Sequence, residues 1–349
     1  MTVVYLLGTP GVWGGLERNT MELADALSTA HDVHLLADET YAAKVPRAVS
    51  FHPLKMSRGQ KSRLLSWQIG RHLRKLRPHI IHAMGPKGAV MLAAHAGLAR
   101  RLGAITVGSA QGIKREYDAY RGFDGIVAVN REIASRIEHG RIEVIPNGVE
   151  PAPPASSAVD VCFRERQQWP GTLALAVGRL APVKGYDVLL EAWAATSGAH
   201  LAFLGDGPER AALEQKCVDL NLATRVTFLG HRTDVAAWMT VADVMVMSSR
   251  REGFPYVLIE ALQADCPVLA TGVGGIVGVL PADFMVPPDS PAELAGLLNR
   301  WLPAIAELHE RQADLFQLAR TDLTVSSMTA KVVSLYEKCQ AASNVSRVE

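Results

Sequence analysis

The amino-acid sequence predicts an α/β protein with two doubly wound domains. Short apolar runs alternate with amphipathic stretches, a pattern typical of parallel sheets covered by helices. This alternation stops at a segment rich in Pro, Ala and Ser, and then begins again. The chain of 349 residues is long enough for about two domains, and its content of 48% hydrophobic and 20% charged residues suits two cores.

The first half, residues 1–155, is predicted to form the first domain. An apolar, β-branched run at residues 3–7 leads into a glycine-rich turn, and leucines spaced along one helical face follow it. Further strand-like runs occur at residues 33–36, 80–82, 105–107, 126–129 and 143–145. The Pro-Asn-Gly of residues 146–148 ends the series, and residues 151–160 are the expected linker.

The second half repeats the alternation, and residues 156–324 are predicted to form the second domain. A strand at residues 173–177 is followed by a helix at residues 186–195. Later strands are expected at residues 201–204, 226–229, 244–247 and 268–270. Residues 325–349 carry apolar side chains at helical spacing, which predicts a terminal helix.

Neither a metal site nor a membrane span is expected. The cysteines lack the paired spacing of metal ligands, which favours a reduced, intracellular setting; they are Cys162, Cys217, Cys266 and Cys339. Residues 2–7 have no basic segment ahead of them, so they do not resemble a signal peptide. No apolar run reaches the roughly 18–20 residues of a membrane-spanning helix.

Positive charge is concentrated in the first half. No Asp or Glu occurs from Thr40 to Arg115, whereas this segment contains fifteen Lys and Arg residues. Its densest part, residues 55–77, mixes basic residues with Leu, Ile and Trp, as in helices that lie on anionic lipid surfaces. The alternative is an ordinary surface helix with its apolar stripe in the core. Nucleic acid is disfavoured, because aromatic residues that could stack on bases are not interleaved along the rest of the segment.

Two carboxylates, Glu252 and Glu260, are the strongest functional signal. Pro255 favours the first turn of a helix, which would carry Glu260 on its second turn and leave Glu252 in the preceding loop. Helix starts bind anions and polar ligands, so the two carboxylates could hold different hydroxyl groups of one elongated substrate. For Glu260 the alternative is a salt bridge with Arg250 or Arg251.

Two cations, Arg179 and Lys184, follow the first predicted strand of the second half. Ligands of open α/β sheets bind beyond the carboxyl ends of strands, so both cations would face the ligand crevice. Together they could stabilise a departing diphosphate without a metal ion, although an isolated pair could also be ordinary surface charge.

Gly14 and Gly15 lie between the first predicted strand and the first predicted helix. Their backbone could approach a phosphate closely, and a plain tight turn explains them equally well. The Gly-x-Gly-x-x-Gly fingerprint of dinucleotide-binding domains is absent here.

In order and spacing, the motifs resemble glycosyltransferase family 4 (glycosyl transferases group 1), which are retaining enzymes of the GT-B fold that use nucleotide sugars. The resemblance covers about residues 3–340. The motifs are Gly14-Gly15-x-Glu17, Pro146-Asn147-Gly148-Val149, Gly178-Arg179-x4-Lys184-Gly185, Gly205-x-Gly207-Pro208, Phe228-Leu229-Gly230 and Glu252-Gly253-Phe254-x5-Glu260-Ala261. The resemblance implies two Rossmann-like domains that face a central cleft, with the terminal helix crossing back to the first domain.

The resemblance also implies roles for the site residues. Arg179 and Lys184 would hold the donor diphosphate, and Glu260 would bind the nucleotide ribose. Glu252 would face the hydroxyls of the donor sugar, and it joins the two cations as the expected catalytic group. The donor would further be bordered by Gly14, Gly15, Gly253, Phe254 and Pro255. Neither a cofactor nor a metal is expected, because the nucleotide sugar is a substrate.

The sequence departs from the family pattern on the acceptor side. Gln111 occupies the place of a histidine near the reacting sugar, and a glutamine cannot act as an acid or base near neutral pH. His82 keeps only the first histidine of a His-x-His pair; it could contact the acceptor, but a structural histidine is the more expected role. A glutamate that commonly follows Gly274-Gly275 is missing.

The resemblance, together with these residues, implies a retaining, metal-independent hexosyltransferase. It would use a nucleotide sugar, with UDP favoured over GDP, and a lipid-linked glycan or lipopolysaccharide-type acceptor bound by the first domain. Its expected location is the cytoplasm, peripheral on the inner face of the cytoplasmic membrane, with no nucleic-acid partner. The alternatives are a soluble transferase acting on a small acceptor, a non-catalytic nucleotide-sugar binder and a sugar-nucleotide epimerase.

Overall fold

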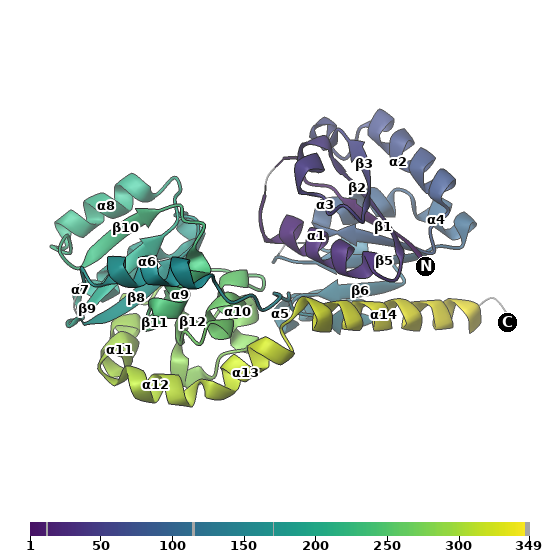
Figure 1. Ribbon diagram of the computed structural model, residues 1–349. Coiled ribbons are helices and arrows are strands. Elements are labelled where there is room, and N and C mark those ends of the chain that lie inside the picture. Colours follow the sequence, from purple (N-terminus) through teal and green to yellow (C-terminus); the bar gives the residue numbers. More distant parts are fainter. Residues whose placement is uncertain (12, 114–115, 170, 346–349) are drawn as a thin grey trace. The chain divides into compact units, whose positions relative to one another are not determined.

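The computed structural model describes residues 1–11, 13–113, 116–169 and 171–345 (Figure 1). The chain divides into two compact units. Unit 1 combines residues 1–148 with residues 325–349, and unit 2 consists of residues 149–324. The first boundary therefore lies at 148/149 instead of the predicted 155/156, because Val149 already donates its backbone N–H to the Leu323 carbonyl of unit 2, at 2.9 Å.

Unit 1 contains a seven-stranded parallel sheet in the order β3-β2-β1-β4-β5-β6-β7. The strands are β1 (Thr2–Leu7), β2 (Asp32–Asp38), β3 (Ser50–Leu54), β4 (Ile80–Met84), β5 (Ile105–Ala110), β6 (Gly125–Ala128) and β7 (Ile142–Val144). The central strands are buried on both faces, as their continuous apolar runs require. Strand β3 was not predicted, because Pro53 interrupts it; as an edge strand it tolerates the missing backbone donor.

Six α-helices belong to the described part of unit 1: α1 (Gly15–Ser28), α2 (Arg63–Leu76), α3 (Gly85–Ala93), α4 (Ala96–Leu102), α5 (Arg131–Ser135) and α14 (Val325–Val345). The Ser62 side chain caps α2 by accepting from the Leu65 N–H, and Arg77 ends it in a left-handed conformation. The terminal helix α14 packs on α1, β5 and β6, and its apolar face completes the core of this unit. None of the described helices is long and apolar enough to cross a bilayer.

Unit 2 contains a six-stranded parallel sheet in the order β10-β9-β8-β11-β12-β13. Its strands are β8 (Thr172–Val177), β9 (Ala199–Leu204), β10 (Val226–Gly230), β11 (Val244–Met247), β12 (Val268–Thr271) and β13 (Met285–Val286). Successive strands run outward in one direction from β8 and in the other from β11, so the order reverses between these two neighbours. Such a switch point opens a crevice at the carboxyl ends of the two strands.

The helices of unit 2 are α6 (Ser156–Arg166), α7 (Tyr186–Ala194), α8 (Arg210–Asp219), α9 (Val235–Val241), α10 (Tyr256–Gln263), α11 (Pro291–Trp301), α12 (Ile305–Arg311) and α13 (Ala313–Thr321). Three fully buried tryptophans anchor this unit, namely Trp193, Trp238 and Trp301. The expected linker overlaps α6, because its Ser and Ala residues are compatible with a helix once Cys162 is buried. The irregular connection is thus shorter than the sequence indicated.

Candidate functional site at the switch point of unit 2

The loops after β8 and β9 interlock through glycines. A Cβ at Gly205 would lie 1.9 Å from the Gly178 carbonyl oxygen, and one at Gly207 would lie 2.3 Å from that of Leu180. The Leu180 N–H donates to the Asp206 carbonyl at 3.0 Å. Both glycines are therefore required for close backbone packing, which holds the loop that begins at Gly178 in one conformation.

Lys184 and Glu252 form an ion pair at this switch point, with 2.8 Å between the lysine Nζ and the carboxylate Oε1. The Ser249 hydroxyl donates to the same oxygen at 2.7 Å. The two charged side chains keep only 20% and 12% of their surface exposed. The cation motif after β8 and the carboxylate motif after β11 thus meet, although they are far apart in the sequence.

The backbone on either side of Lys184 is held against the end of β11. The Ser248 hydroxyl donates to the Lys184 carbonyl at 2.9 Å. A Cβ at Gly185 would lie 2.1 Å from the Ser248 carbonyl oxygen, and Gly185 has a φ of 61°. Only glycine combines this close approach with a left-handed conformation at low cost.

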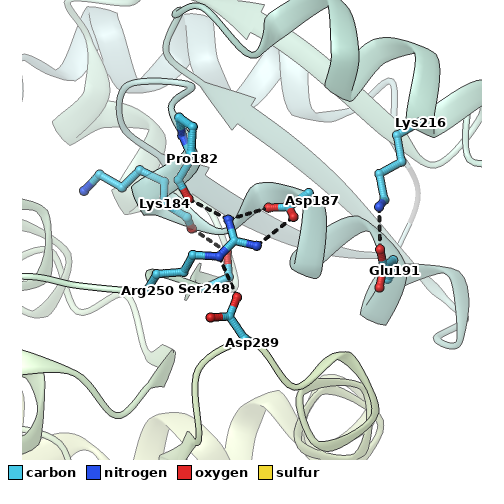
Figure 2. A network of polar contacts seen from close by, with 8 residues as sticks. All are labelled: Pro182, Lys184, Asp187, Glu191, Lys216, Ser248, Arg250 and Asp289. Atoms are coloured by element: carbon cyan, nitrogen blue, oxygen red, sulfur yellow. Dashed lines mark hydrogen bonds and ion pairs between the residues drawn. The ribbon is translucent and has the colours of Figure 1, made fainter.

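Arg250 is the centre of the polar network in Figure 2. Its guanidinium donates to both Asp187 carboxylate oxygens at 2.9 and 2.7 Å, to Asp289 at 2.5 Å and to the Pro182 carbonyl at 2.6 Å. Burial raises the pKa of Asp187, but the hydrogen bonds and charge of Arg250 outweigh it and hold the pKa below its ordinary value. The Arg250 N–H also binds the Val183 carbonyl, so one residue fixes the turn that carries Lys184.

Arg179 differs from Lys184 in its surroundings. Its side chain is exposed, and within the described part of the chain it makes no hydrogen bond or ion pair. A guanidinium left free at the carboxyl end of β8 can bind two oxygens of a phosphate without first breaking an internal contact.

The loop from Glu252 to α10 is supported by a second glycine pair. A Cβ at Gly274, where φ is 52°, would lie 2.0 Å from the Glu252 carbonyl oxygen. The Gly275 N–H donates to the Gly253 carbonyl at 2.7 Å, and Phe254 is buried against Gly275. The loop that lacks the family glutamate therefore supports the Glu252 loop through backbone contacts.

Helix α10 begins one residue later than the sequence predicted. Pro255 has extended dihedral angles, φ −75° and ψ 127°, and caps the helix instead of forming its first turn. Glu260 lies on the second turn, as expected, and is half-buried. Arg250, one of the two arginines considered for Glu260, binds Asp187 and Asp289.

In unit 1 the glycine motif precedes α1. Gly15 is the first residue of the helix, and Gly14 caps it in an extended conformation. Glu17 is buried in the first turn, where it accepts the Thr9 hydroxyl at 2.6 Å and is favoured by the helix dipole. The motif thus forms an ordered helix start.

His82 is fully buried in unit 1. Its Nδ1 lies 2.6 Å from the Tyr336 hydroxyl, and its Nε2 lies 2.8 Å from the Ser109 hydroxyl. Burial lowers the pKa of His82 to about 3, so the ring is neutral. His82 has no exposed surface, so its ring is not available to contact an acceptor in this structure.

Gln111 follows β5 and is half-buried. Its amide donates to the Asn19 side chain at 2.5 Å, and Asn19 in turn donates to Asn147 at 3.1 Å. This chain of amides ties the Pro-Asn-Gly turn to α1, and it contains no group that could serve as a base near neutral pH.

Arg250, Ser249 and Tyr186 support the site but were not predicted. Tyr186 is fully buried beside the loop, where burial and the Glu252 carboxylate raise its pKa. The two adjacent arginines in residues 248–251, Ser-Ser-Arg-Arg, were a visible signal for Arg250. The sequence did not reveal Asp187 and Asp289 as the partners of Arg250. Across the described ranges, no three acidic, His or Cys side chains are grouped as metal ligands.

Two family models match this chain. The model described as Glycosyl transferases group 1 matches residues 171–303, and the model described as Glycosyltransferase Family 4 matches residues 13–152. The two matches do not overlap, and together they cover more than two thirds of the chain.

Curated relatives include several bacterial glycosyltransferases. The chain is 34% identical over 184 residues to the 2-deoxystreptamine glucosyltransferase of Streptomyces kanamyceticus, which covers 48% of this chain and 48% of that enzyme. The match thus spans about half of that relative's length. It is 26% identical over 292 residues to the lipopolysaccharide core biosynthesis glycosyltransferase LpsD of Rhizobium meliloti (strain 1021), covering 79% of this chain and 80% of LpsD.

Among solved structures, Anabaena HepE in complex with UDP has a TM-score of 0.84 at 21% identity and covers 97% of this chain and 100% of HepE. HepE in complex with UDP-glucose gives a TM-score of 0.82 at 20% identity, with the same coverage. This likeness concerns the fold, and it confirms the predicted α/β class of two Rossmann-like domains, GT-B.

Proposed function

Because this chain belongs to the group 1 and family 4 glycosyltransferases, we propose that it transfers a hexosyl group from a nucleotide sugar to a glycan acceptor. The observation that carries this proposal is the ion pair of Lys184 and Glu252 at the switch point of unit 2, with Arg179 exposed after the end of β8. Two cations and a carboxylate at the carboxyl ends of adjacent strands suit a ligand with a diphosphate and a sugar.

In the proposed reaction, Arg179 and Lys184 bind the diphosphate and stabilise the charge that develops on it as the sugar departs. The Glu252 carboxylate accepts hydrogen bonds from hydroxyls of the donor sugar, and Glu260 accepts those of the ribose. The ion pair with Lys184 fixes the position of the Glu252 carboxylate. The loops braced by Arg250 contribute positioning, which by itself lowers the barrier of a two-substrate reaction.

Retention of configuration follows from attack on the same face that the diphosphate leaves. The leaving phosphate then accepts the proton of the acceptor hydroxyl, so the protein needs neither a side-chain base nor a metal ion. The neutral amide of Gln111 supports this route, because it cannot remove a proton near neutral pH.

For the donor we propose a UDP-sugar, supported by the complexes of HepE with UDP and UDP-glucose. For the acceptor we propose a lipopolysaccharide-type or other lipid-linked glycan, supported by the relative LpsD. Helix α2 supports action at an anionic membrane surface on the cytoplasmic side, since it exposes Leu64 and Trp67 among its basic residues.

Thermal unfolding with a panel of UDP- and GDP-sugars tests the donor. A ligand at 100 times its dissociation constant stabilises the folded state by about 2.7 kcal/mol, so the best donor should raise the unfolding midpoint clearly. Transfer is then measured with that donor and a glycolipid acceptor. If no nucleotide sugar shifts the midpoint, the proposal is wrong.

The second candidate function is a binding protein without turnover, favoured by the absence of a base at Gln111. It would show the same midpoint shift, but neither transfer to any acceptor nor slow hydrolysis of the donor. An epimerase would convert the donor sugar without an added acceptor.

A further inference from the structure

A hollow of about 320 Å³ lies in unit 1 where α2 faces α4. Its lining includes none of the residues predicted to bind the donor. Its lining includes Trp67, Gly70, Arg74, His95, Gly97 and Arg101. We use the name α2–α4 groove for the hollow formed by these residues.

The buried ring of His95 lies at the floor of the α2–α4 groove. The ring nitrogens of His95 lie 2.7 Å from the Met91 carbonyl and 2.9 Å from the Ser66 carbonyl, so this buried ring ties α2 to the end of α3. A Cβ at Gly70 would lie 3.4 Å from the Arg74 Nη1, and one at Gly97 would meet only the Arg101 Nη1, at 4.0 Å. The two glycines therefore leave room in front of the arginines.

The α2–α4 groove carries a positive charge that no acidic residue of the surrounding helices neutralises. Arg74 and Arg101 are exposed, and among the described residues neither makes a hydrogen bond or an ion pair. No acidic residue occurs from Thr40 to Arg115, so none of the helices around the groove can neutralise them. Two guanidinium groups beside an open hollow can donate hydrogen bonds to the oxygens of a phosphate.

The exposed indole of Trp67 lines the same groove. Trp67 keeps 56% of its surface exposed, and Leu64, three residues earlier on α2, keeps 47%. The Arg71 guanidinium lies 5.7 Å from the centre of the Trp67 ring. An exposed indole next to free arginines is typical of side chains at the interface between lipid headgroups and acyl chains.

We propose that the α2–α4 groove binds the phosphate headgroup of an anionic phospholipid, with Trp67 and Leu64 entering the interfacial layer. The occupant is a lipid because α2 carries Arg74 together with the exposed Trp67 and Leu64, so that charge and apolar surface lie on the same helix; a soluble phosphate would use only the charge. The inference rests on the proposed action at a membrane, and it names the site through which unit 1 reaches the lipid.

Co-sedimentation with phosphatidylcholine vesicles, with and without phosphatidylglycerol, tests the site on the full chain without any donor. We expect the protein to bind the anionic vesicles and the double variant Arg74→Ala/Arg101→Ala to lose about 30-fold in partition coefficient. Arg47→Ala/Arg131→Ala removes the same charge from exposed positions outside α2 and α4, and should lose less than about fivefold.

The variant Gly97→Leu fills the groove without changing any charge, and leucine is a better helix former than glycine. We expect it to weaken binding to the anionic vesicles as well. The proposal is overturned if Gly97→Leu binds the anionic vesicles like the wild type and Arg74→Ala/Arg101→Ala loses no more in partition coefficient than the control variant. The attraction to the vesicles would then come from positive charge spread over the surface, without a specific site. Equal binding of the wild type to both vesicle types overturns the proposal too.

Two further measurements separate this inference from the proposed function. The unfolding midpoint of each variant establishes that it is folded. The response of the wild type to nucleotide sugars, measured without vesicles, tests the donor site alone. A protein that binds donors but not anionic vesicles contradicts only the groove, whereas one that binds vesicles but no donor contradicts only the transferase.

Discussion

Arg250 holds both carboxylate oxygens of Asp187, at 2.9 and 2.7 Å, and thereby joins the end of β11 to the first turn of α7. The same guanidinium reaches the Pro182 carbonyl, two residues before Lys184. The position of the lysine that is proposed to bind diphosphate thus depends on a pair to which no contact with the donor is assigned.

Replacing Lys184 by alanine should lower the rate of sugar transfer by about 10²–10³-fold, because a fixed positive charge next to the diphosphate is lost. The fold should be retained, since the lysine is partly exposed. The rate is measured with saturating donor. Lys216→Ala is the matched control, because Lys216 also pairs with a glutamate of unit 2, Glu191, away from the site (Figure 2). Near-normal turnover in the Lys184 variant would exclude the proposed role.

Replacing Arg250 by alanine should lower the free energy of unfolding by about 1–3 kcal/mol, because charged hydrogen bonds are lost. It should also weaken donor binding, since the turn before Lys184 loses its support. Arg250→Lys should recover only part of both effects, because lysine lacks the planar fork.

The control for Arg250 is Arg166→Ala, which breaks a comparably buried ion pair with Asp243 elsewhere in unit 2. Stability and the donor dissociation constant are measured together. Arg166→Ala should lose stability but keep the donor constant. If the Arg250 variants do the same, Arg250 is structural only.

His82 should make the stability of the protein depend on pH. Burial lowers its pKa in the folded state to about 3, from an ordinary value of 6.5. Between these values the unfolded chain binds the extra proton, so stability falls as the pH falls, by up to about 1.4 kcal/mol per pH unit.

Urea unfolding of the wild type and His82→Gln over this range isolates the contribution. Burial also lowers the pKa values of His52 and His200, and their contributions cancel in the difference between the two proteins. The glutamine variant should gain stability relative to the wild type as the pH falls. If the stabilities of the two proteins changed with pH in parallel, the pKa of His82 would be the same in the folded and unfolded states.

Gly274→Ala should destabilise unit 2 by more than about 2 kcal/mol. The added Cβ would lie 2.0 Å from the Glu252 carbonyl oxygen, at a backbone φ of 52°. Gly278→Ala, at a position with open space, is the control and should have little effect. The comparison uses denaturant midpoints, together with donor binding, because displacing Glu252 should weaken it. A Gly274 variant as stable as the control would contradict the packing described for this loop.

Much of the fold was predictable because buried parallel strands need continuous β-branched and apolar runs, and such runs are visible at β1, β4 and β8. Strand β3 was not, since Pro53 resembles a strand breaker until the strand is known to lie at a sheet edge.

The meeting of Lys184 and Glu252 was predictable in outline, because both motifs follow strands that end at the same edge of a sheet. The partners of Arg250 were not predictable, since any acidic residue brought near by the fold could pair with it. His82 illustrates the same limit. Its burial depends on Tyr336, 254 positions later, and no local pattern encodes that contact.

The Tyr336 contact has a consequence for the order in which the protein can be completed during synthesis. The strands of unit 1 leave the ribosome first, yet the core around Tyr5 and His82 stays open until residues 325–345 have been made. Unit 2 is a single uninterrupted segment and can finish folding earlier. The half of the protein that is translated first therefore cannot complete its core until the last helix has been made.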